Sequence, residues 1–210
     1  EITRLLGGDQ EFGERERVIV TNGKPDAALT NNLNDRPTTD ESTMALAAVL
    51  PVTLAKTPDE IAVIGWGSGL TTHTILGSAA PKRVETIEIE PAMYEAAKKF
   101  GDRVERAYTD PRSVAVFEDA RSHFARVGKR YDAIVSEPSN PWVSGTASLF
   151  TQEFYRMLSR HLKDDGVLVQ WIHIYEIDDE VFATMPAALS RVFPHVQVYV
   201  VNSGDLLMVA

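Results

Sequence analysis

The sequence predicts an α/β fold, in which a small N-terminal β-hairpin lobe precedes a Rossmann-like, mostly parallel sheet of seven strands. Three observations predict it. The apolar run 61–64 ends in glycines at alternate positions, Gly65, Gly67 and Gly69. A second strand-like run, 84–90, ends in acidic residues about 20 positions later. The last two strand-like runs are separated only by residues 202–204, which makes them an antiparallel pair.

Composition limits the function classes. The chain has 210 residues, of which 44% are hydrophobic and 24% charged, as is typical of a soluble globular domain. Its net charge is −9, which argues against nucleic acid as a partner. The absence of cysteine excludes disulfides, thiolate metal sites and a cysteine nucleophile. No apolar run reaches the roughly 18 residues of a membrane span, and we expect a cytoplasmic location.

The chain is expected to divide into an N-terminal β-hairpin lobe with its loop, residues 1–36, and a nucleoside-cofactor-binding domain, residues 37–210. Asn22-Gly23 is the strongest short hairpin signal, and residues 31–37 are polar and rich in turn formers. The chain starts without Met and ends on an apolar run, so we expect a piece of a longer protein. A helix is predicted from 41 to 55, capped by Thr39 or Asp40 and kinked or ended by Pro51.

Strands and helices alternate after this first helix. The predicted strands are 61–64, 84–90, 114–117, 131–136, 167–171, 196–201 and 205–209. The predicted helices are 70–76, 92–100, 150–162 and 178–193, the last with a kink at Pro186. A turn at Asp164-Asp165-Gly166 separates the third of these helices from the next strand. This is the layout of class I S-adenosylmethionine-dependent transferases.

The glycine turn predicts a nucleoside site. Glycine permits positive φ and lets a ligand approach the backbone. The spacing is G-x-G-x-G and not G-x-G-x-x-G, which points away from a dinucleotide loop. Glu88 ends the next strand, where an acid accepts hydrogen bonds from ribose hydroxyls. The structural alternative is a tight turn without a ligand.

Ligands of such sheets bind beyond the carboxyl ends of the strands, which directs attention to Asp119 and Glu137. Asp119 can accept from an adenine amino group while the Ala120 N–H donates to a ring nitrogen; alternatively, Asp119 is a helix cap. Glu137 lies in a loop stiffened by two prolines. Trp142 is either a wall of the cleft or a core residue. The five histidines show no metal spacing, and no metal is expected.

Five segments together resemble the spermidine synthase family, and most closely its bacterial branch of spermidine synthase-like domains, often fused to a membrane-transporter-like segment. The resemblance extends from about Gly13 to the end of the chain. The segments are Asn22-Gly23-Lys24-Pro25-Asp26 and residues 64–69, 84–91, 131–142 and 148–155.

The resemblance implies decarboxylated S-adenosylmethionine as the aminopropyl donor and a diamine such as putrescine as the acceptor. Carried over to this sequence, Glu88 would hold the ribose and Asp119 the adenine. Glu137 stands where the family has the catalytic aspartate, which accepts a proton from the attacking amine. A homodimer is considered as the assembly.

The departures from the family pattern affect the amine-binding half. Ser68 replaces an acid of the glycine turn that meets the donor's ammonium group, and Asn140 replaces the second acid of the D-x-x-D loop, which holds the diamine. Met44 and Ala45 replace a tyrosine-histidine pair. Two lost carboxylates would weaken cation binding by about 10² to 10⁴. Trp142 and Asn140 remain candidate acceptor contacts.

Three functions therefore stay open. The leading hypothesis is a spermidine synthase-like aminopropyltransferase with an undetermined amine acceptor. The second is a methyltransferase that uses S-adenosylmethionine itself, for which Ser68 is suited because that donor carries a carboxylate. The third is a binding domain without turnover.

Overall fold

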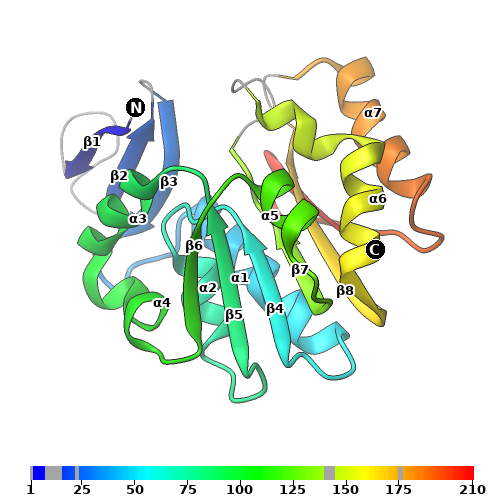
Figure 1. Ribbon diagram of the computed structural model, residues 1–210. Coiled ribbons are helices and arrows are strands. Elements are labelled where there is room, and N and C mark those ends of the chain that lie inside the picture. Colours follow the sequence, from blue (N-terminus) through cyan, green and yellow to red (C-terminus); the bar gives the residue numbers. More distant parts are fainter. Residues whose placement is uncertain (1, 8–15, 22–23, 140–144, 175–176) are drawn as a thin grey trace.

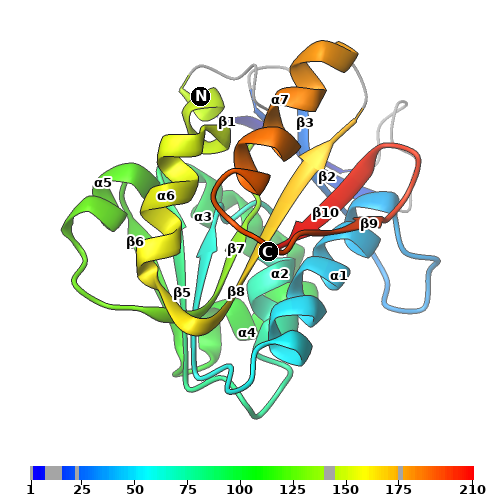
Figure 2. The same cartoon turned by 90° about the vertical axis from the view of Figure 1, so that its right-hand side faces the viewer.

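The computed structural model describes residues 2–7, 16–21, 24–139, 145–174 and 177–210. Its centre is a seven-stranded sheet in the order β6-β5-β4-β7-β8-β10-β9, of which β6 to β8 are labelled in Figure 1 and β9 and β10 in Figure 2. The strands are β4 (Glu60–Ile64), β5 (Arg83–Glu88), β6 (Ser113–Phe117), β7 (Tyr131–Ser136), β8 (Leu162–His173), β9 (Gln197–Val200) and β10 (Asp205–Val209). Strands β4 to β8 are parallel, and β10 pairs antiparallel with β8 and β9. The predicted fold class is confirmed.

Helices cover both faces of this sheet (Figure 2). On one face lie α1 (Thr39–Leu54) and α2 (Leu70–Ile75), and on the other α5 (Ala120–Arg126), α6 (Gln152–His161) and α7 (Asp179–Ser190). Successive residues of a strand point to opposite faces. Ile61 and Val63 therefore pack against α1 and α2, whereas Ala62 and Ile64 pack against α5 and α6. Burial on both faces explains the continuous apolar runs in the sequence.

The N-terminal lobe is a separate antiparallel sheet of three strands. They are β1 (Ile2–Gly7), β2 (Glu16–Thr21) and β3 (Lys24–Thr30). The pairing of β2 with β3 confirms the predicted hairpin, although its Asn22-Gly23 turn lies outside the described residues. Strand β1 is an addition that the prediction lacked. Buried Ile19 and Leu29 join a third core cluster with Trp66 and with α3 (Pro91–Ala97), η1 (Lys98–Val104) and α4 (Glu105–Thr109).

The first helix begins two residues earlier than predicted, and its cap is Thr38. The Thr38 hydroxyl accepts from the Glu41 N–H at 3.0 Å, and the Glu41 carboxylate accepts from the Thr38 N–H at 2.8 Å. This reciprocal pair is a capping box. The prediction of Thr39 or Asp40 as the cap was wrong, and the Asp40 side chain is left for another role. The helix also continues past Pro51 to Leu54.

Two further boundaries differ from the prediction. The helix predicted from 150 to 162 is α6, which begins two residues later because Thr151 caps it through the Phe154 N–H, and a short helix that was not predicted, η2 (Thr146–Phe150), precedes it. Strand β8 includes Asp164-Asp165-Gly166, which was predicted as a turn. Its pairing with β7 shifts register between Leu162 and Val167, so these residues form an irregularity inside the strand. Among the described residues, no helix is long and apolar enough to cross a membrane.

Candidate active site

A cavity of about 650 Å³ lies at the carboxyl ends of the central strands, where the strand order reverses between β4 and β7. Its wall combines β3, the N-terminal half of α1, the glycine turn after β4, the ends of β5, β6 and β7, and the hairpin before β10. The Glu137 N–H donates to the Ile64 carbonyl at 2.9 Å, and the Gly65 N–H donates to the Ile87 carbonyl at 2.9 Å. These bonds hold the three strand ends together.

The structure brings only part of the glycine turn to this cavity. Gly65, with φ of +94°, and Gly67, with φ of +52°, line it, and no other atom lies within 4 Å of the position that a Gly67 Cβ would occupy. Ser68 is fully buried; its hydroxyl donates to the Met44 sulfur at 3.1 Å and accepts from the Leu70 N–H at 3.2 Å. Neither Ser68 nor Gly69 is among the residues that line the cavity.

Glu88 lies at the end of β5, with its carboxylate against the glycine turn. One carboxylate oxygen accepts from the Trp66 N–H and the other from the Glu90 N–H, both at 2.8 Å. Burial raises the pKa of Glu88 above its ordinary value. Each carboxylate oxygen has a second lone pair, so Glu88 can still accept from two hydroxyls of a ligand in the cavity.

Asp119 and Ala120 line the cavity at the start of α5. One Asp119 oxygen accepts from both the N–H and the hydroxyl of Ser122, each at 2.9 Å. The cap interpretation of Asp119 is therefore confirmed. Because all of its described hydrogen bonds use that one oxygen, the second oxygen is the one that a ligand would meet.

Glu137 directly follows β7 and is partly buried in the cavity wall beside Pro138. Burial raises its pKa to about 7; the negative charge of Asp205 adds to this rise, and a hydrogen bond from Thr71 opposes it. A carboxylate with this pKa can take a proton at neutral pH. The predicted acceptor contacts Asn140 and Trp142 lie outside the described residues.

Every ionisable side chain among the described residues of the cavity wall is acidic. The eight carboxylates are Asp26, Asp40, Glu88, Glu90, Glu118, Asp119, Glu137 and Asp205. Five of them were not recognised as site residues from the sequence, namely Asp26, Asp40, Glu90, Glu118 and Asp205. Asp26 accepts from the Ser139 hydroxyl at 3.1 Å, and this bond connects the N-terminal lobe to the loop after β7. The cavity is thus suited to a cationic ligand.

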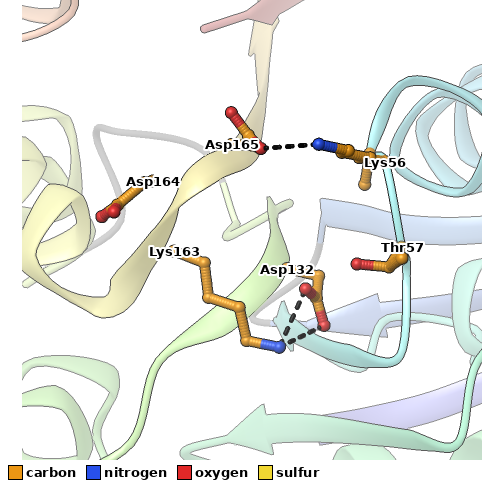
Figure 3. A pocket seen from close by; sticks show the side chains of 7 residues that line it. Lys56, Thr57, Asp132, Lys163, Asp164 and Asp165 are labelled. Atoms are coloured by element: carbon orange, nitrogen blue, oxygen red, sulfur yellow. Dashed lines mark hydrogen bonds and ion pairs between the residues drawn. The ribbon is translucent and has the colours of Figure 1, made fainter.

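A second, smaller cavity of about 150 Å³ lies at the opposite ends of the strands, near the start of β7 and β8. Its charges neutralise one another: Lys163 donates to both oxygens of Asp132, and Lys56 pairs with Asp165 (Figure 3). We assign no site to it. In the described part of the chain, no group of three or more His, Cys, Asp or Glu is arranged to hold a metal ion.

Comparison of this sequence with known proteins finds relatives that agree with one another. The model of the spermine/spermidine synthase domain matches residues 43–204. A polyamine aminopropyltransferase 2 of Hyperthermus butylicus is 30% identical over 187 residues, covering 88% of this chain and 58% of that protein. The polyamine aminopropyltransferase of Bacillus subtilis is 26% identical over 157 residues, covering 75% and 56% respectively. The chain therefore spans less than two thirds of the length of these relatives.

Solved structures give the same fold. Spermidine synthase from Thermotoga maritima superposes over the whole chain and 72% of its own length, with a TM-score of 0.74 and 22% identity. A spermidine synthase in complex with the transition state analogue AdoDATO has a TM-score of 0.77 and 21% identity, covering 100% of this chain and 74% of that one. Human methyltransferase-like protein 13 in complex with SAH covers 81% of this chain and 80% of its own, with a TM-score of 0.59 and 20% identity.

Proposed function

Because this chain belongs to the spermine/spermidine synthase family, we propose that it transfers an aminopropyl group from decarboxylated S-adenosylmethionine to a small amine. The observation that carries the proposal is the cavity at the switch point, in which the glycine turn and Glu88 meet a wall whose ionisable side chains are all acidic. Both substrates are cations, since the donor is a sulfonium with an ammonium group and the acceptor amine is protonated at neutral pH. A wall of carboxylates attracts both.

The nucleoside half of the donor would occupy the part of the cavity between β4 and β6. Glu88 would accept from the two ribose hydroxyls through its free lone pairs. The free oxygen of Asp119 would accept from the adenine amino group, and the Ala120 N–H would donate to a ring nitrogen. Gly65 and Gly67 leave room for the donor's tail, because neither projects a side chain into the cavity.

The reaction is a displacement at carbon. The lone pair of the neutral amine attacks the aminopropyl carbon bonded to sulfur, and the carbon–sulfur bond breaks. Its electron pair returns to sulfur, so the positive sulfonium becomes neutral methylthioadenosine. The acceptor arrives as an ammonium ion, so Glu137 first takes one of its protons and thereby frees the attacking lone pair; the new nitrogen–carbon bond then leaves a secondary ammonium, which keeps its positive charge. A base is required at this place because an amine is nucleophilic only when it is unprotonated.

The same cavity argues against the methyltransferase alternative. S-adenosylmethionine carries a carboxylate that its decarboxylated form lacks, and that carboxylate would meet a wall of acids, of which only Glu118 has a described cationic partner, Arg126. Ser68 offers no compensation there, because it is buried behind the turn and bonded to Met44. The donor form without the carboxylate therefore suits the wall better.

The test combines binding with product analysis. Calorimetry would compare decarboxylated S-adenosylmethionine, S-adenosylmethionine and methylthioadenosine, and the expected order places S-adenosylmethionine weakest. Chromatography would then follow methylthioadenosine release with a panel of amines. Preferential binding of S-adenosylmethionine with a methylated product would favour the methyltransferase. Binding of methylthioadenosine without any product would favour a binding domain.

A further inference from the structure

Asp205 is fixed against the N-terminal half of α1 by donors that carry no charge. One of its oxygens accepts from the Thr43 hydroxyl at 2.8 Å and from the Asn202 amide at 2.9 Å, and the other from the Trp171 indole N–H at 3.0 Å. The residue is only 7% exposed. Hydrogen bonds from neutral groups hold the carboxylate in place but leave its negative charge uncompensated.

Asp40 lies one helical turn before Thr43 and lines the same cavity. Since Thr38 caps the helix, Asp40 is free of that task, and its carboxylate accepts a hydrogen bond from the Ala28 backbone N–H. The neighbouring Glu41 has a different environment, because it is fully engaged with Thr30 and Arg103. Burial, and next the charge of Asp205, raise the pKa of Asp40 to about 6. The two carboxylates therefore share one region of the cavity.

Asp205 also connects this region to the site of reaction, because its charge acts on Glu137 as well as on Asp40. Among the described residues of the cavity wall, no basic side chain compensates the charges of Asp40 and Asp205. Two desolvated carboxylates in this situation are unfavourable unless a cationic ligand binds between them. We propose that Asp40 and Asp205 bind the second ammonium group of the acceptor, while its first amine reacts at Glu137. The inference rests on the proposed function and deepens it, since it assigns the residues that select diamines over monoamines.

The assignment changes what the departures from the family pattern mean. Asn140 in place of an acid predicts weak binding of a diamine. Asp40 and Asp205 lie on α1 and β10, outside the loop that carries Asn140, and they supply two negative charges to the same cavity. The acceptor half of the site would then keep its negative charge, with the carboxylates supplied by α1 and β10 and not by the loop that carries Asn140.

The test is Asp40→Asn, which removes one charge and keeps the shape of the side chain. With 1,4-diaminobutane, kcat/KM should fall at least tenfold through a higher KM, whereas with butylamine it should stay within about twofold. The matched control is Asp164→Asn, whose side chain is 96% exposed at the opposite end of the sheet. The control should leave the ratio of the two substrates unchanged. An equal loss with both amines, or an unchanged ratio in Asp40→Asn, would overturn the inference.

A binding measurement separates this inference from the proposed function. Calorimetry of 1,4-diaminobutane in the presence of methylthioadenosine requires no turnover, and Asp40→Asn should weaken binding at least tenfold. If Asp40→Asn weakens diamine binding in this way but no amine gives a product, the proposed transferase activity is refuted and the diamine subsite is retained. Turnover with unweakened diamine binding in Asp40→Asn would refute the subsite alone. Asp205→Asn should reproduce the Asp40→Asn result if its melting temperature shows that it folds; a folded Asp205→Asn with full diamine affinity counts against the inference.

Discussion

Gly65 and Glu137 are in direct backbone contact at the switch point of the sheet. A Cβ on Gly65 would lie 2.3 Å from the Glu137 carbonyl oxygen, and Gly65 has φ of +94°. No side chain fits in this space, and the obstructing atom belongs to the backbone and not to a flexible side chain. The first glycine of the turn is therefore required by the segment that carries the proposed base.

Gly65→Ala should consequently impair stability and turnover together. The added methyl group must displace either the turn or the Glu137 backbone, at a cost of about 1 to 3 kcal/mol in the free energy of unfolding. Urea denaturation and the rate of methylthioadenosine release measure the two effects. Gly128→Ala is the control, because no atom lies within 4 Å of its Cβ position. Wild-type turnover in Gly65→Ala would show that the contact does not position Glu137.

Glu88→Ala should lower the affinity for methylthioadenosine at least tenfold, or about 1.4 kcal/mol. The substitution leaves two ribose hydroxyls without their acceptor in a buried site. Calorimetry measures the effect, and a melting curve checks that the turn survives the loss of the bond from Trp66. Glu95→Gln, which removes an exposed charge on α3, is the control. Unchanged affinity in Glu88→Ala would remove Glu88 from the ribose site.

Asp119→Ser distinguishes the two roles of Asp119. Serine is also a good N-cap, so α5 should keep its start, but the second carboxylate oxygen, which makes none of the described hydrogen bonds, is lost. The wild-type protein should prefer adenosine to inosine, because the inosine oxygen is an acceptor and has no proton to share with the carboxylate. The variant should lose this preference while retaining its melting temperature. Equal binding of both nucleosides by the wild type would show that Asp119 serves only as the N-cap of α5.

Local sequence patterns were sufficient to predict most of the fold. Each central strand is buried on both faces, so it appears in the sequence as a short apolar run bounded by turn residues. The order of alternating elements then determines the sheet, since crossovers between parallel strands are right-handed. Two of the predicted boundaries that were wrong depend on single polar side chains, since Thr38 rather than Asp40 caps α1 and Thr151 begins α6. The turn predicted at Asp164-Asp165-Gly166 was wrong for another reason, because these residues form an irregularity inside β8.

The site was predictable where it follows a strand directly. Gly65, Glu88 and Glu137 each come at or immediately after a strand end, and the parallel sheet brings those ends together. Asp40 and Asp205 could not be found in this way. Their approach depends on the packing of α1 against the terminal hairpin, which no local pattern encodes. Ser68 was placed in the site by its position between two glycines, yet its side chain turns into the core.

Glu137→Gln should reduce turnover by roughly 10² to 10⁴ and leave the affinity for methylthioadenosine nearly unchanged. The amide keeps the shape of the side chain but cannot accept the proton. In the wild type, turnover should fall as the pH decreases through about 7, because Glu137 is then protonated. Asp205 is the charged group that raises this pKa, so Asp205→Asn should move the inflection to lower pH. A pH profile without an inflection in this range would argue against Glu137 as the base.

The same variant should increase the stability of the fold at alkaline pH. The pKa of Glu137 is raised from 4.5 to about 7 in the folded protein, so the folded state binds the proton more tightly than the unfolded state does. The ionised group therefore destabilises the fold above pH 7, and this penalty disappears as the pH falls toward 4.5. A shift of this size corresponds to at most about 3 kcal/mol, and the partial exposure of Glu137 reduces it.

Urea denaturation of Glu137→Gln at pH 8 should accordingly give a free energy of unfolding about 1 to 3 kcal/mol above that of the wild type. At pH 5 the difference should fall below about 1 kcal/mol, because Glu137 is then protonated in the folded state and the pH is only about half a unit above the ordinary pKa of 4.5 that applies in the unfolded state. Glu95→Gln removes a charge from an exposed position and should show no such difference between the two pH values. Equal stability of Glu137→Gln and wild type at pH 8 would mean that burial does not disfavour the ionised carboxylate. In that case Glu137 would titrate as an ordinary glutamate and would be too weak a base at neutral pH for the role proposed here.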